Sequence, residues 1–287
     1  MCVAMESTIL PLPVMNVIKQ LNIQFKDKRE YRNDGKHNKR RHDRRPTEPF
    51  NATVIQKKEG IDVTIASIKT NLFKLTEKTY EAVSNEIIIL LDTIMEEATE
   101  EEQMNVVNGM FDTMSVNKIF ASLYSKLYKC CYEKYEIFKI KLSDEIIKYK
   151  NNLKTIVFVS ANENYEDFCR YNSDNESRKA KTSMFVHMMK EGILSFGEIE
   201  ELLEYVCDEL KGKMKVAGNK EVVEELSENV FILLSLTMTE MKEQNIFGKW
   251  KLFVETMSKA SVSENKGYSS RSKFKYMDIL DIYNGKK

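Results

Sequence analysis

Proline and glycine are scarce in most of this sequence, and their scarcity argues against folds built from many tight turns. The chain has 287 residues, and its four prolines (Pro11, Pro13, Pro46 and Pro49) all lie near its beginning. The whole chain contains only 10 glycines. β-sandwiches and barrels need turn residues at short, regular intervals, and residues 50–287 do not supply them. A proline-free stretch of this length is typical of consecutive α-helices.

Long apolar runs, paired cysteines and metal-binding motifs are also missing. No apolar run reaches the roughly 18 residues that a membrane-spanning helix requires, so we expect no membrane contact. The 5 cysteines are odd in number and scattered, which favours reduced thiols in a cytosolic or nuclear protein. No glycine-rich phosphate loop and no C-x-x-C motif occurs, and His187 lies alone on an apolar stretch. We therefore expect no metal, no cofactor and no enzymatic activity, and a binding function instead.

Residues 1–60 differ in composition from the rest and predict a disordered basic tail. The whole chain balances 44 basic residues against 44 acidic ones, whereas residues 26–45 contain ten basic and four acidic residues. Such a polar segment buries too little apolar surface to offset the entropy lost on folding. The side chains that we expect to contact RNA phosphates are Lys28, Arg29, Arg32, Lys39, Arg40, Arg41, Arg44 and Arg45. Clustered basic residues also form nuclear import signals, and this alternative stays open.

A short apolar stretch, residues 10–25, precedes the basic segment. The side chains that fall at helical spacing after Pro13 are Val14, Val17, Ile18 and Leu21. Proline suits the first turn of a helix, and an amphipathic helix can dock into a groove of a partner. We expect this stretch to dock onto a partner protein. Packing against the folded part of the same chain is the alternative.

From residue 61 onward, apolar residues recur at helical spacing. After a first stripe from Val63 to Leu75, Thr76 is placed to cap the following helix. The further helices expected from the pattern cover 78–96, 101–114, 117–130, 143–160, 165–191, 196–215, 219–241, 247–261 and 270–283. Helices of this length with short polar breaks favour about five antiparallel pairs, in an all-α, HEAT-like solenoid over residues 61–287. A compact helical bundle is the alternative.

Three segments of the helical region carry a recognisable pattern. Residues 68–80 read IKTNLFKLTEKTY, residues 164–195 read NYEDFCRYNSDNESRKAKTSMFVHMMKEGILS, and residues 269–287 read SSRSKFKYMDILDIYNGKK. In this order they resemble the middle domain of the eukaryotic translation initiation factor 4G family. The stretch IFASLYSKLYKCCYEKY at 119–135 is similar to a helix of that family's second repeat. Two departures are Phe73, where the family usually has Asn, and Glu77, where it often has Pro.

The resemblance implies a cytoplasmic translation scaffold without bond chemistry of its own. Its partners would be a DEAD-box RNA helicase of the initiation machinery, messenger RNA and a cap-binding protein, and the cap-binding subunit is where residues 10–25 would dock. The first segment places the helicase contact at Leu72, Leu75 and Tyr80, although Leu72 and Leu75 also belong to the expected core stripe. The chain is short for a cellular initiation factor of this family, and a stripped-down middle domain would suit a viral copy or a divergent paralogue.

Two other functions fit the same sequence. One is a related helical scaffold of splicing, nuclear cap binding or messenger-RNA surveillance. The other is a plain RNA-binding protein that acts through its basic tail, with the helices as a support. A nuclear import signal in residues 26–45 would favour the first of these.

Several residues outside these sites have simpler interpretations. Trp250 is expected to be a packing anchor. Arg271, Lys273 and Lys275 can meet an acidic surface of the helicase or an RNA phosphate, or stabilise their helix through its dipole. The methionines expected to fill the core are Met184, Met188 and Met189.

Deleting residues 26–45 should flatten the salt dependence of RNA binding. Ten basic residues neutralise several phosphates, so the affinity of the intact chain should fall steeply between about 50 and 200 mM salt. Fluorescence anisotropy titrations with a labelled RNA at several salt concentrations measure this slope. If the deletion leaves affinity and slope unchanged, the segment is a spacer or an import signal.

Overall fold

The computed structural model describes residues 60–286, and these residues fold entirely into helices and connecting loops. They form 11 α-helices, one 3-10 turn and no strand. The all-α prediction is therefore confirmed. The expected disordered tail, the expected docking stretch at 10–25 and the expected RNA-binding residues between Lys28 and Arg45 lie outside the described residues.

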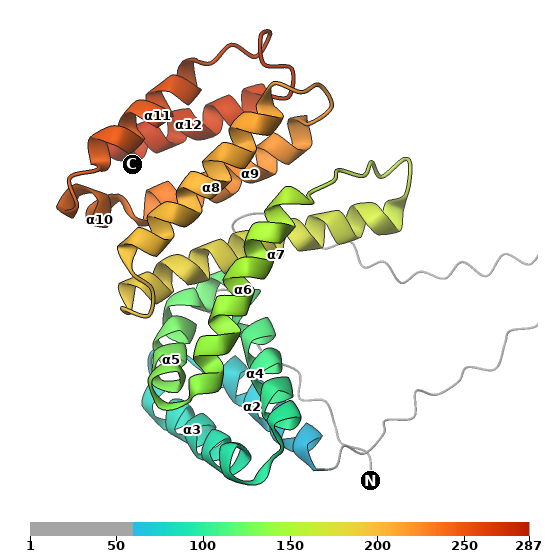
Figure 1. Ribbon diagram of the computed structural model, residues 1–287, viewed down its shortest axis with the longest axis vertical. Coiled ribbons are helices and arrows are strands. Elements are labelled where there is room, and N and C mark those ends of the chain that lie inside the picture. Colours follow the sequence, from blue (N-terminus) through green and yellow to red (C-terminus); the bar gives the residue numbers. More distant parts are fainter. Residues whose placement is uncertain (1–59, 287) are drawn as a thin grey trace, which may run out of the picture. The chain divides into compact units, whose positions relative to one another are not determined.

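The elements follow one another with short connections (Figure 1). The first half contains α2 (Ile61–Lys74), α3 (Tyr80–Glu97), α4 (Glu100–Ser115), η1 (Lys118–Phe120), α5 (Ala121–Lys134) and α6 (Glu136–Lys154). The second half contains α7 (Tyr165–Lys190), α8 (Phe196–Met214), α9 (Lys220–Leu236), α10 (Met238–Glu243), α11 (Phe247–Lys259) and α12 (Ser270–Tyr283). None of these helices is both long and apolar enough to cross a membrane.

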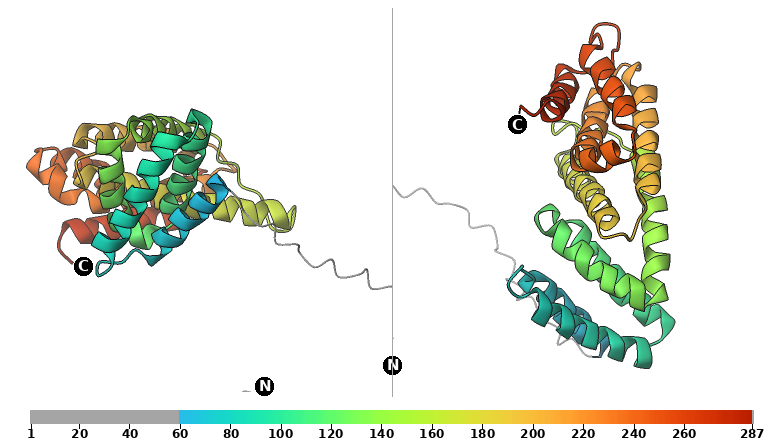
Figure 2. Two further views of the ribbon diagram at one scale, coloured as in Figure 1. Left: turned by 90° about the horizontal axis from the view of Figure 1, so that it is seen from below. Right: turned by 90° about the vertical axis from the view of Figure 1, so that its left-hand side faces the viewer.

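The helices pack in two rows, as in helical-repeat proteins (Figure 2). In one row α2 packs against α4, α4 against α6, and α6 against α8. In the other, α3 packs against α5, α5 against α7, α7 against α9, and α9 against α12. Contacts such as α2 with α3, α8 with α9 and α11 with α12 join the rows. The helical-repeat arrangement predicted from the sequence is confirmed, with the short α10 inserted between α9 and α11.

Side-chain caps fix where several helices begin. At the start of α4, Thr99 accepts a hydrogen bond from the Glu102 amide, and the Glu102 carboxylate accepts one from the Thr99 amide. Ser195 and Glu198 form the same capping box at α8. The Asn164 side chain caps α7 by accepting bonds from two amides of its first turn. Such caps satisfy amides that have no partner inside the helix.

Four expected features were wrong in detail. The helix expected at 143–160 is α6, at 136–154, because the β-branched and aromatic residues after Thr155 do not continue it. The helix expected at 219–241 divides at Thr237, whose hydroxyl donates to the Leu233 carbonyl. Val63 is exposed and is not part of the buried stripe. Thr76 does not cap α3; Thr79 stands at its N-cap, and the two hydroxyl oxygens lie 2.9 Å apart.

One continuous apolar core runs through the described helices. Trp250 is buried and contacts Phe253 edge-on, which confirms its role as a packing anchor. The expected core methionines are all buried: Met184, Met188 and Met189. Large rings fill the space between helices, as where Tyr149 of α6 meets Phe185 of α7 edge-on.

A polar network crosses this core at the junction of α6, α7 and α9. The Tyr149 hydroxyl lies 2.5 Å from the Thr182 hydroxyl and donates to Asn229 Oδ1 over 3.3 Å. Thr182 also donates to Asn229 Oδ1 at 2.7 Å, and Asn229 Nδ2 donates to the Glu225 carbonyl at 2.8 Å. Because all three side chains are buried, each hydrogen bond replaces one that water would otherwise make.

Asn229→Ala should lower the free energy of unfolding by about 2–4 kcal/mol. The substitution leaves the buried Tyr149 and Thr182 hydroxyls without their shared acceptor and opens a small cavity. Urea unfolding followed by circular dichroism measures the loss. Asn172→Ala, at an exposed position of α7, is the matched control and should change stability by less than about 0.5 kcal/mol. Equal unfolding midpoints for the two variants would contradict the importance of the network.

Candidate partner-binding surfaces

The first family-like segment forms the end of α2, the turn after it and the start of α3. Within it, Leu72 is 0% exposed and Leu75 is 1% exposed. The Tyr124 hydroxyl donates to the Leu72 carbonyl at 3.2 Å and ties this turn to α5. Leu72 and Leu75 therefore belong to the core, which was the alternative that the sequence left open. In this structure they offer no exposed side chain to a helicase.

Tyr80, the third expected helicase contact, is half-buried at the first position of α3. The ammonium group of Lys126 lies 5.1 Å from the centre of its ring. Its hydroxyl is buried. Burial raises the pKa of Tyr80 above its ordinary value. Part of the ring remains accessible, so Tyr80 can take part in both folding and binding.

An exposed apolar cleft lies beside the first segment, between the ends of α2 and α4. We call it the α2–α4 cleft. Phe73 is 72% exposed and lines it together with Asp112, Thr113, Val116 and Asn117. Its volume is about 430 Å³. Phe73 is one of the two departures from the family pattern, and the structure places its ring at the surface.

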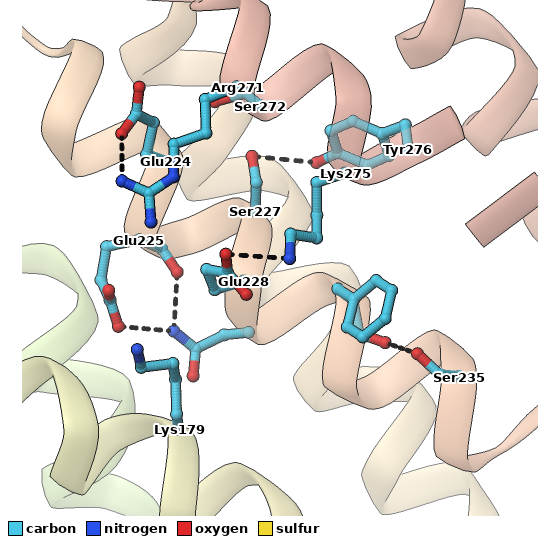
Figure 3. Close-up of polar contacts among 12 residues, drawn as sticks. Lys179, Glu224, Glu225, Ser227, Glu228, Ser235, Arg271, Ser272, Lys275 and Tyr276 are labelled. Atoms are coloured by element: carbon cyan, nitrogen blue, oxygen red, sulfur yellow. Dashed lines mark hydrogen bonds and ion pairs between the residues drawn. The ribbon is translucent and has the colours of Figure 1, made fainter. Parts of the chain in front are cut away.

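The third segment, which forms α12, pairs its basic residues with glutamates of α9 (Figure 3). Arg271 Nη1 lies 3.4 Å from Glu224, and Lys275 Nζ lies 3.0 Å from Glu228. Lys273 donates to the Ala260 carbonyl at 3.4 Å. The acidic residues that Arg271 and Lys275 contact therefore belong to the same chain.

Glu225 lies in the same row of α9 and is 6% exposed. Burial raises its pKa to about 7, although the nearby charges of Lys179 and Arg178 act in the opposite direction. The Asn229 amide donates to its carboxylate over 3.4 Å, and Lys179 approaches from α7 (Figure 3). Glu225 thus changes charge near neutral pH inside a groove between α7, α9 and α12.

A second cleft, which we call the α6–α7 cleft, has a basic lining. Arg170, Arg178 and Lys181 of α7 border a space of about 360 Å³, opposite the end of α6 and the following loop. Lys181 contacts Glu145 at 2.9 Å, and Lys141 contacts the same carboxylate at 2.7 Å. Burial alone would raise the pKa of Glu145, but hydrogen bonds from the two lysines outweigh it and hold the pKa at about 2.

Sequence reasoning missed both charged surfaces. The α9 row had a visible signal, because Glu221, Glu224, Glu225 and Glu228 stand three or four positions apart and share one helix face. The α6–α7 cleft had a partial signal, since Arg170, Asp174, Arg178 and Lys181 stand three or four positions apart on α7, but its other residues come from α6 and a loop. Within residues 60–286, no group of three or more His, Cys, Asp or Glu side chains is arranged to hold a metal ion.

The second and third family-like segments meet on the same helix. The second begins at the cap of α7 and contains that whole helix, the third contains α12, and both helices pack against α9. In comparisons with known proteins, no family model and no curated protein matches the chain. The functional argument therefore depends on the three segments and on the surfaces described above.

Glu225→Gln should make the protein more stable at alkaline pH. The folded state raises the pKa of Glu225 from 4.5 to about 7, so it holds a proton that the unfolded chain releases in that interval. Its contribution to stability is complete below pH 4.5 and is lost as the pH rises through 7. A neutral glutamine avoids this loss, and we expect a gain of about 1–3 kcal/mol at pH 8 relative to the unsubstituted chain.

Urea unfolding at pH 5, 6, 7 and 8 measures this difference. Glu133→Gln, at an exposed position of α5, removes the same charge and serves as the control. If the two variants shift stability equally at every pH, the buried carboxylate is not the source of the pH dependence.

Proposed function

We propose that this protein is a translation initiation scaffold that binds a DEAD-box RNA helicase and messenger RNA. In this role it helps to recruit or unwind messenger RNA within a cap-binding complex. The observation that carries the proposal is the order of the three family-like segments, which fall on α2–α3, α7 and α12 of one helical-repeat array. Each segment is weak by itself, whereas three in the family's order on that architecture support one another.

The architecture suits a scaffold. Stacked helix pairs present surfaces that lie far apart in the sequence, and each surface can engage a different part of a partner. A DEAD-box helicase cycles between open and closed arrangements of its two lobes. A rigid scaffold that binds one arrangement better than the other shifts the helicase toward it.

The α2–α4 cleft is the surface on which we place the helicase. Exposed apolar side chains gather there, and such patches commonly mark protein interfaces. Phe73 projects from the family-like segment itself and serves as the anchor, and the half-buried Tyr80 lies in the same segment. Leu72 and Leu75 support this surface from inside the core. The RNA and cap-binding contacts expected in residues 1–60 remain predictions.

Phe73→Ala should weaken helicase binding by about 1–3 kcal/mol without lowering the melting temperature. A large, exposed aromatic anchor contributes to binding when a partner buries it, but little to folding before that. Affinity for a purified initiation helicase, measured by biolayer interferometry, and the helicase's RNA-dependent ATPase rate are the two readouts. Tyr80→Ala should reduce both affinity and stability, because its ring is half-buried.

Two controls accompany this experiment. Phe274→Ala removes another exposed phenylalanine, from α12, and should leave helicase binding unchanged. Leu72→Ala should lower the melting temperature, because the side chain is buried. If the unsubstituted chain binds no initiation helicase but captures a helicase of splicing or surveillance, the related scaffold function replaces this one. If it binds no helicase at all, the proposal fails.

A further inference from the structure

The lining of the α6–α7 cleft holds more cations than carboxylates: Arg170, Arg178 and Lys181 against Asp167 and Asp174. Glu145 lies behind Lys181, and its single carboxylate is shared by Lys141, Lys148 and Lys181. Of these three lysines, Lys181 is the one that lines the cleft. Arg170 and Arg178 add two further cations to the lining.

Arg178 is the least satisfied of these cations. Its Nη2 donates to the Asn175 side chain, but its Nε–H is buried and finds no acceptor among the described residues. A buried donor without an acceptor costs roughly 1–3 kcal/mol, and native proteins seldom keep one without a reason. An anionic oxygen bound in the cleft would satisfy it, because a guanidinium group binds phosphate oxygens well.

The cleft also has apolar and aromatic walls. Val157, in the loop that follows α6, is exposed, and the rings of Tyr171 and Phe158 meet edge-on, 5.4 Å apart between their centres. Tyr171 and Val157 both line the cleft. Sites for single-stranded nucleic acid combine these groups. The cations hold the phosphate backbone, and the ring and the exposed aliphatic side chain contact the unpaired bases.

Two carboxylates, Asp167 and Asp174, share the lining with the cations. Arg170 pairs with Asp167 at 3.2 Å, whereas Asp174 is exposed on the next turn of α7. A carboxylate repels phosphate but accepts a hydrogen bond from a ribose 2′-hydroxyl. This hydroxyl distinguishes RNA from DNA, so the mixed lining favours RNA.

We propose that the α6–α7 cleft binds a short single-stranded RNA segment, with Arg170, Arg178 and Lys181 on its phosphates and Asp174 on a 2′-hydroxyl. The inference rests on the proposed function, in which RNA is a partner. It places a second RNA site on the helical array, in addition to the contact predicted in the basic tail. Tyr171 and Val157 contact the base or the sugar.

The test uses the full chain, with the eight expected RNA-binding residues of the tail changed to Gln so that the cleft is measured alone. The probes are a fluorescein-labelled 12-nucleotide oligouridylate and its deoxy counterpart, titrated by anisotropy at several salt concentrations. In the tail-substituted chain, the double change Arg170→Gln with Arg178→Gln should weaken RNA binding about tenfold or more. The slope of log affinity against log salt concentration should become shallower by about one to two. Asp174→Asn should lower the preference for RNA over DNA.

A double variant elsewhere supplies the matched control. Lys211→Gln with Lys259→Gln removes two exposed cations from α8 and α11 and should change RNA affinity by less than about twofold. Circular dichroism melting verifies that each variant folds. If Arg178→Gln lowers the melting temperature, Arg170→Glu at an exposed position tests the same site by charge reversal.

The outcomes separate this proposal from the scaffold function. If the tail-substituted chain does not bind RNA, or if the cleft and control variants bind equally, the cleft is not an RNA site. Displacement of the RNA by a phosphoserine peptide but not by unlabelled RNA would assign the cleft to a phosphorylated protein instead. Helicase affinity, measured in the same variants without RNA, should be unchanged. If no variant binds the helicase, the scaffold function is refuted while the RNA site is unaffected.

Discussion

Asn229, a single buried asparagine, connects the three helices at the centre of the described structure. Its carbonyl oxygen accepts hydrogen bonds from Tyr149 of α6 and Thr182 of α7, and its amide group donates to α9 itself. A buried network is favourable only when every member is satisfied, so it restricts these helices to one relative register. Both charged grooves border helices of this junction, and their geometry depends on that register.

In the second half of the described structure, some basic side chains are paired with carboxylates of the same chain, whereas others line a cleft that a partner can enter. Cations of α12 are paired by glutamates of α9, along the contact between these two packed helices. In the α6–α7 cleft, Arg170, Arg178 and Lys181 stand beside two carboxylates, and the buried Nε of Arg178 has no acceptor among the described residues. A basic residue in this chain is therefore no indication of a binding site by itself. Its neighbours in the fold determine whether its charge reaches a partner.

The positions of most helices could be predicted from the sequence, because apolar periodicity and caps such as Ser195 with Glu198 are local signals. Two helix ends were predicted wrongly, at Thr237 and at the β-branched residues after Thr155. At both places the apolar pattern of a helix continues while other local features end the helix. The surfaces were less predictable. The apolar periodicity predicts that Leu72 is a core residue, whereas the resemblance predicts that it contacts a partner. Only the packing of the folded chain decides between the two. The pairing of Arg271 with Glu224 joins residues far apart in the sequence, and no local pattern reveals it.

The two-row arrangement has a consequence for cooperativity. In a helical array each pair is stabilised mainly by its neighbours, so a pair at one end of the array opens more readily than one in the middle. The first described pair, α2 with α3, packs mainly on α4 and carries Phe73 and Tyr80. A protein that binds this pair would slow its local opening, and amide hydrogen exchange in α2 and α3 would slow with it. Such a partner would stabilise the array from its end inward.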